Sequence, residues 1–176
     1  MRTADEVLSR VGYTRPPVPV HDILLEYGLQ IHVQALEANV SGFLVRRETG
    51  AFVGVNALHH RNRQRFTLAH ELGHFILHHD DPTIFVDDAL IHFRGEDVTE
   101  SSDICEMEAN AFAGALLMPE KMLRQDLAGR FIDALDESAV RTLARRYEVS
   151  PQALTIRLMR VGLLGGVAPP RGTGHQ

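Results

Sequence analysis

The sequence contains a single cysteine, Cys105, among its 176 residues, which excludes an internal disulfide. It has no apolar run near the roughly 20 residues that a membrane-spanning helix needs. The first six residues lead into no long apolar segment, so a signal peptide is not expected. Internal repeats are also absent. Together these absences predict a cytoplasmic protein without a membrane span.

The composition is that of an ordinary folded domain, with an uneven distribution of charge. Hydrophobic residues make up 44% of the chain, and its length suits one domain or one domain with a small appendage. The formal net charge is −5, and residues 80–108 contain ten acidic residues and one basic residue, Arg94. This acidic segment is either a solvated loop or an acidic rim that attracts a basic partner.

Capping, turn and periodicity signals predict an α+β fold. Thr3 and Glu6 have the spacing of a capping box, and residues 48–50 form a turn between two strand-like runs. Helices are expected at residues 3–10, 20–27, 61–79, 103–118, 119–128, 137–147 and 151–161. Strands are expected at residues 29–36, 42–46 and 51–56, with short ones at 83–86 and 90–93.

Residues 70–74 read His-Glu-Leu-Gly-His, which is the H-E-x-x-H pattern. On a helix, residues four apart share one face, so the imidazoles of His70 and His74 can bind one metal ion. Glu71 lies about 100° around the helix, where its carboxylate can accept a proton from an attacking water. The pattern predicts a metal-dependent hydrolase, most simply a peptidase.

The third metal ligand has to come from outside this motif, because a catalytic zinc site usually has three protein ligands. His78 lies about 12 Å along the helix from His70, too far to share the ion. The helix at residues 103–118 offers Glu106 and Glu108, and helical phase favours Glu106. Asn110, one turn later, is a candidate for orienting a ligand. The expected inward stripe is Glu106, Ala109, Asn110, Ala113 and Leu117.

The chain resembles the ImmA/IrrE family of metallopeptidases in three blocks. They are Arg-Phe-Thr-Leu-Ala-His-Glu-Leu-Gly-His at 65–74, Glu-Met-Glu-Ala-Asn-Ala-Phe-Ala at 106–113, and Leu-Leu-Met-Pro at 116–119. The resemblance implies a zincin-like fold in which His70, His74 and Glu106 hold the ion and Glu71 is the general base. Zn²⁺ is the expected metal, and the same ligands can hold Mn²⁺ or Fe²⁺.

Two further residues are weaker candidates for contact with substrate. The strand at 51–56 is expected to be the sheet edge along which an extended substrate lies. Asn56 at its end either binds the substrate backbone or forms a turn. His92, in the acidic segment, is a candidate oxyanion stabiliser, with an ordinary surface histidine as the alternative.

Residues 143–154 resemble a helix-turn-helix, with Val149 and Ser150 at the turn and Glu148 where glycine is usual. Residues 138–160 carry five arginines and one glutamate, which fits phosphate contact. Packing of this helical pair against the rest of the chain is favoured over DNA binding. The expected organisation is a zincin-like domain at 1–130 with a small antiparallel sheet packed on helices. A helix-turn-helix-like segment at 131–164 and a disordered tail at 165–176 follow it.

The resemblance implies a metal-dependent endopeptidase that cleaves a helix-turn-helix transcriptional repressor. Cleavage would relieve repression of stress-response, phage or mobile-element genes. The expected partner is a basic repressor, and direct nucleic-acid binding is less favoured. One alternative is a DNA-binding or antitoxin-like regulator with a structural metal site. The other is a protein that binds its repressor without cleaving it.

Overall fold

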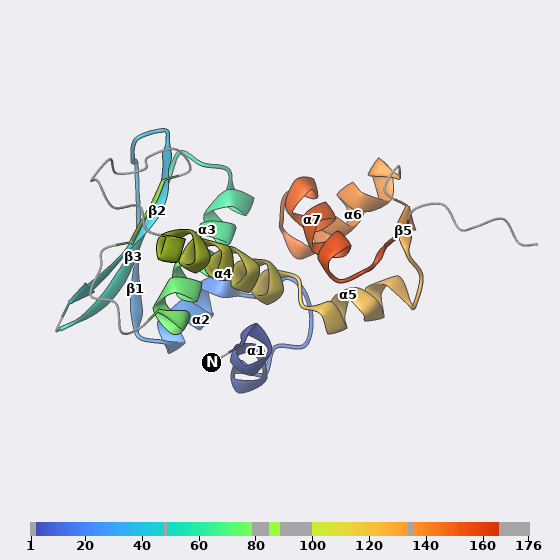
Figure 1. Ribbon diagram of the computed structural model, residues 1–176, viewed down its shortest axis with the longest axis horizontal. Helices are drawn as coiled ribbons and strands as arrows, with labels where there is room; N and C mark the ends of the chain where they lie inside the picture. Colours follow the sequence, from blue (N-terminus) through green and yellow to red (C-terminus); the bar gives the residue numbers. More distant parts are fainter. Residues whose placement is uncertain (1–2, 48, 79–84, 89–99, 134–135, 166–176) are drawn as a thin grey trace, which may run out of the picture.

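The computed structural model describes residues 3–47, 49–78, 85–88, 100–133 and 136–165, which form an α+β fold (Figure 1). Its helices are α1 (Ala4–Val11), α2 (Val20–Glu26), α3 (Arg61–Leu77), α4 (Glu100–Leu117), α5 (Glu120–Leu127), α6 (Glu137–Tyr147) and α7 (Pro151–Arg160). Its strands are β1 (Leu29–Gln34), β2 (Val40–Arg47), β3 (Gly50–Asn56), β4 (Phe85–Asp88), β5 (Ile132–Asp133) and β6 (Leu164–Gly165). None of the described helices has the length and apolar character needed to cross a bilayer.

The main sheet has the strand order β1-β3-β2-β4 and is mixed. β2 forms antiparallel ladders with β3 and β4, whereas β1 runs parallel to β3, from Leu29 opposite Ala51 to Gln34 opposite Asn56. The predictions of an antiparallel sheet and of an edge strand at 51–56 are therefore wrong. β1 pairs with β3 along its whole length, so β3 is flanked by a strand on each side.

Helix α3 lies between the sheet and α4 (Figure 1). It packs against β2 and β3 on one side and against α4 on the other. Every residue from Thr67 to His74 is buried. At its C-terminal end, the guanidinium of Arg46 on β2 donates to the carbonyls of His74 at 2.8 Å and His78 at 2.7 Å. The His74 carbonyl also accepts from the His78 N–H, and the bonds from Arg46 fix this end of α3 to the sheet.

The α6–α7 pair packs against the N-terminal half of α3. The side-chain amide of Asn62 donates to the carbonyl of Val149 at 2.9 Å, and Arg65 forms an ion pair with Glu148 at 3.4 Å. Glu148 has a φ of 52°, the left-handed conformation for which glycine is the usual residue. This packing is what the favoured interpretation of residues 143–154 expects. The proposed division into domains stays a prediction.

Some expected features lie outside the described residues. The short strand predicted at 83–86 overlaps β4, which spans Phe85–Asp88. The strand predicted at 90–93, the candidate His92 and the tail from residue 166 are outside that part of the chain. The capping box at the start of α1 is confirmed, because the Thr3 and Glu6 side chains each bond the other residue's backbone N–H.

Candidate metal centre

Three potential metal ligands converge where α3 and α4 meet. The Nε2 atoms of His70 and His74 are 2.9 Å apart. The Glu106 carboxylate reaches His70 Nε2 at 3.3 Å with one oxygen and His74 Nε2 at 3.0 Å with the other. Both imidazoles are buried, and the Glu106 side chain is 46% exposed. Within the described residues this is the one group of three such ligands, and it unites the three that the sequence nominates.

The close approach of α3 and α4 depends on small residues at their crossing. A Cβ atom built on Gly73 would lie 3.1 Å from the Cα of Ala109 and 3.2 Å from the ring of Phe112. Ala109 is itself fully buried. A larger side chain at either position would push α4 outward, and Glu106 with it. Gly73 therefore acts through packing, which the sequence analysis did not predict, although a glycine inside a helix signals close contact.

Glu71 is fully buried on the side of α3 that faces β2. A Cβ atom on Gly42 of β2 would clash with the Cγ2 atom of Thr67 and would lie 3.7 Å from Glu71 Oε1. Gly42 thus allows β2 to pack closely against Thr67, one turn before Glu71 on α3. This role of Gly42 was not predicted from the sequence, although a glycine inside a predicted strand is a signal for such close packing.

The electrostatics of Glu106 and His74 favour the protonation states that bind metal. Burial would raise the pKa of Glu106, but hydrogen bonds from His70 and His74 outweigh this effect and hold that pKa well below its usual range. Burial lowers the pKa of His74, against the opposing effect of Glu106. An ionised carboxylate and a neutral imidazole are the forms that ligate metal ions.

The geometry of the cluster fits a divalent cation. In a tetrahedral zinc site with bonds of about 2.0–2.1 Å, neighbouring ligand atoms lie roughly 3.3–3.4 Å apart. The three separations of 2.9, 3.0 and 3.3 Å come within a few tenths of an ångström of that value. A cation there would also supply the positive charge that favours the ionised form of the buried Glu71.

The other two candidates on the α4 side take different positions. Glu108 lies beside His78, 3.7 Å from its Nε2 atom, so Glu106 is the glutamate that meets the histidine pair. Asn110 is exposed, and the prediction that it lies on the inward stripe is wrong. Ala109 and Ala113 are fully buried and mark the true centre of that stripe, which places Asn110 at its outer edge.

Asn56 is fully buried and joins the turn after β3 to the connection between β1 and β2. Its side-chain oxygen accepts from the N–H groups of Leu36 and Leu58, and its side-chain nitrogen donates to the carbonyls of Glu37 and Val40. Those four bonds use both donors and both acceptor positions of the amide. The structure therefore supports the turn-forming interpretation of Asn56 over substrate contact.

Zinc added to the metal-free protein is expected to raise its melting temperature. At a free-ion concentration one hundred times Kd, the increase should be roughly 5–10 °C, because the ion binds the folded state. Differential scanning calorimetry of wild type, His74→Ala and His32→Ala measures it. His32 is exposed on β1, away from the centre, so its variant should keep the increase. An equal increase in His74→Ala would place the ion elsewhere.

Comparisons with known proteins agree with this site. A family model described as the IrrE N-terminal-like domain matches residues 26–159. The radiation response metalloprotease IrrE of Deinococcus radiodurans is 41% identical over 97 residues, which cover 54% of this chain and 27% of that protein. Its namesake from Deinococcus deserti is 36% identical over 96 residues, covering 54% and 31%. The matched segment thus spans less than a third of the length of either relative.

A solved structure shares the fold at low sequence identity. It is described as a Mycobacterium tuberculosis transcriptional regulator and superposes with a TM-score of 0.60 at 15% identity. The match covers 97% of this chain and 47% of the other chain. At this identity the likeness shows the arrangement of helices and strands alone.

Proposed function

Because the chain belongs to the IrrE N-terminal-like family of metallopeptidases, we propose that it is a metal-dependent endopeptidase that cleaves a helix-turn-helix transcriptional repressor. The observation that carries this proposal is the convergence of His70, His74 and Glu106, with Glu71 buried next to them. Hydrolysis of the repressor would relieve repression of stress-response, phage or mobile-element genes.

His70, His74 and Glu106 would hold a divalent cation, which would supply the Lewis acidity that polarises a scissile carbonyl and lowers the pKa of a water towards neutrality. We propose Zn²⁺, because two imidazoles and one carboxylate are a usual ligand set of catalytic zinc; Mn²⁺ and Fe²⁺ are the alternatives. Glu71 takes a proton from the attacking water and returns it to the leaving amine nitrogen. Its full burial on the side of α3 that faces β2 limits the positions that this carboxylate can take during both transfers.

The substrate class is supported by family resemblance and by charge. Two relatives are named radiation response metalloproteases, which supports a stress-response role for this chain. The acidic segment at residues 80–108 complements a basic repressor, and a repressor acts in the cytoplasm, where we place this protein. We further propose a zincin-like domain at 1–130 and a helix-turn-helix-like segment at 131–164.

Cleavage of a repressor by the purified protein tests this function, with Glu106→Gln and Glu108→Gln as a matched pair. The protein, loaded with zinc, is incubated with each helix-turn-helix repressor of its own genome, and fragments are identified by mass spectrometry. Wild type and Glu108→Gln should cut at one site. Glu106→Gln should not cut the repressor, because it removes a charged metal ligand. Glu108→Gln makes the same change two residues further along the same helix, outside the histidine pair.

Two results would argue against the proposal. Equal cleavage by the Glu106→Gln and wild-type proteins would remove Glu106 from the metal centre. Tight binding of the repressor without cleavage by any variant, in the presence of zinc, manganese or iron, would favour a protein that binds its repressor without cutting it.

A further inference from the structure

Two adjoining hollows form a groove along α7. One lies between α7 and α4 and has a volume of about 280 Å³. The other lies between α7 and the start of α3, with about 560 Å³. Both are lined by Phe66, Ala153 and Ile156, so they are continuous, and we refer to them together as the α7 groove. The groove runs from the N-terminal end of α7 towards its last turn.

Large apolar side chains are exposed along the α7 groove. Met107 on α4 is 66% exposed, and Ile156 on α7 is 41% exposed. Phe66 on α3, which lines both hollows, is half-buried. Single exposed apolar residues are ordinary, but several along one groove mark a surface that another molecule covers. An apolar groove of this kind suits the apolar face of an amphipathic helix.

Arginine is the charged residue type among the described residues that line the α7 groove, and no aspartate or glutamate is among them. Arg63 and Arg157 already donate to the Ser41 hydroxyl and to the Met118 carbonyl. Arg160 is exposed and is the arginine that an acidic side chain would meet. The N-terminal ends of α3 and α7 also meet the groove, at the N-cap residues His60 and Ser150, and add partial positive charge. An occupant with acidic side chains flanking its apolar face therefore complements the groove.

The α7 groove adjoins the candidate metal centre. Met107 follows Glu106 directly in α4, and Asn110, one turn after Glu106, also lines the groove. A protein segment held against Met107 and Asn110 would contact the turn of α4 that carries Glu106. A groove so close to the metal centre is positioned to help select the substrate.

We propose that the α7 groove binds an amphipathic helix of the protein substrate, with an apolar face towards Met107 and Ile156 and acidic side chains towards Arg160. This inference rests on the proposed peptidase function. Duplex DNA is a poorer occupant, because methionine and isoleucine side chains offer no hydrogen bonds to phosphate. The turn before α7 is also engaged with α3 through Asn62 and Arg65.

Designed peptides test the proposal without any proteolysis. Two fluorescein-labelled helices of about 18 residues, roughly 27 Å long, carry the same leucine face, flanked by glutamates in one and by lysines in the other. Anisotropy titrations use the zinc-loaded Glu71→Gln protein, full length. The glutamate peptide should bind, and the lysine peptide should bind at least about tenfold more weakly. Because binding is measured directly, its outcome is independent of whether the wild-type protein cleaves a repressor.

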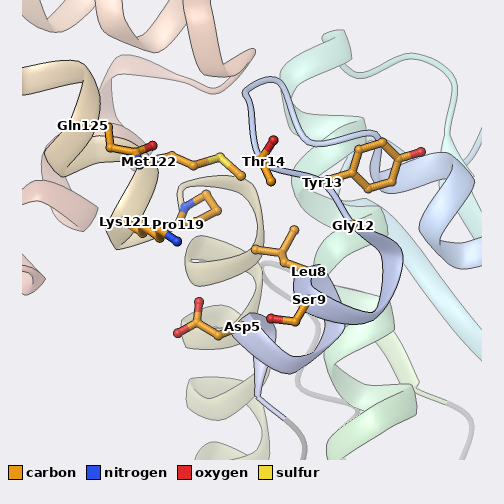
Figure 2. A pocket seen from close by; sticks show the side chains of 10 residues that line it. All are labelled: Asp5, Leu8, Ser9, Gly12, Tyr13, Thr14, Pro119, Lys121, Met122 and Gln125. Atoms are coloured by element: carbon orange, nitrogen blue, oxygen red, sulfur yellow. The ribbon is translucent and has the colours of Figure 1, made fainter.

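Two matched pairs of variants locate the binding. Ile156→Asp should weaken binding of the glutamate peptide about tenfold or more, whereas Val33→Asp, at an exposed valine on β1, should leave this binding unchanged. Arg160→Glu should reverse the preference between the two peptides. Its control is Lys121→Glu, at a separate hollow between α1 and α5 that also contains Asp5 (Figure 2). That variant should leave the preference unchanged.

Four results would overturn the proposal. One is equal binding of the two peptides, and a second is peptide binding that Ile156→Asp leaves intact. Another is duplex DNA binding that is tighter than binding of the glutamate peptide and that is lost in Arg160→Glu. The fourth is a wild-type dimer that Ile156→Asp separates in analytical ultracentrifugation, since the groove would then belong to a second copy of the chain.

Discussion

Glu71→Gln is expected to lower turnover by about 10²- to 10⁴-fold while the protein keeps its metal and its fold. The amide has the shape of the carboxylate but cannot accept the proton of the attacking water at neutral pH. Glu71 is not one of the three clustered metal ligands, so the affinity for zinc should change far less than turnover. Cleavage kinetics of the repressor, with zinc content measured on the same samples, check the expectation.

The division between kcat and KM identifies the role of Glu71. A group that acts in the transition state changes kcat, and KM should stay within a few-fold of wild type. If Glu71→Gln instead lost zinc and turnover together, Glu71 would be part of the metal centre rather than its general base. Unchanged turnover would require another base.

Gly73→Val is expected to destabilise the protein by about 1–3 kcal/mol and to weaken zinc binding about tenfold or more. The valine side chain has no room, because even its Cβ would lie 3.1 Å from the Ala109 backbone. The helices must separate, which moves Glu106 away from His70 and His74. Urea denaturation of the metal-free protein measures the first effect, and zinc titration calorimetry measures the second.

Gly114→Val is the matched control for this prediction. Gly114 is also in a helix, but its nearest neighbour to an added Cβ is the flexible Arg157 side chain at 4.0 Å. The intrinsic helix preference changes equally in the two variants, so stability at Gly114 should move by no more than about 0.5 kcal/mol. Similar losses at both glycines, or normal zinc affinity in Gly73→Val, would contradict the packing role of Gly73.

Local patterns predicted the elements and the ligands well. The spacing of His70 and His74 is a property of one helix, and the preference for Glu106 over Glu108 came from helical phase alone. Both depend on geometry within a few turns of chain. The structure brings these three ligands together as expected, although they come from helices about thirty residues apart in sequence.

The errors concern packing between elements. The buried side of α4 is determined mainly by its packing on α3 and α1, so Asn110 could not be placed from the phase of α4 alone. The position of β3 in the sheet likewise depends on β1, which pairs directly with β3 although β2 lies between them in the sequence. Continuous burial from Val53 to Asn56 reflects that central position.

A crystal structure of the zinc-loaded protein, with an anomalous-difference map at the zinc edge, tests the central claim most directly. The account predicts one peak per chain, within about 2.0–2.2 Å of His70 Nε2, His74 Nε2 and a Glu106 oxygen. It also predicts that the remaining position is left to water, on the side of Glu71. A peak elsewhere, or a fourth protein ligand that closes the site, would contradict the account.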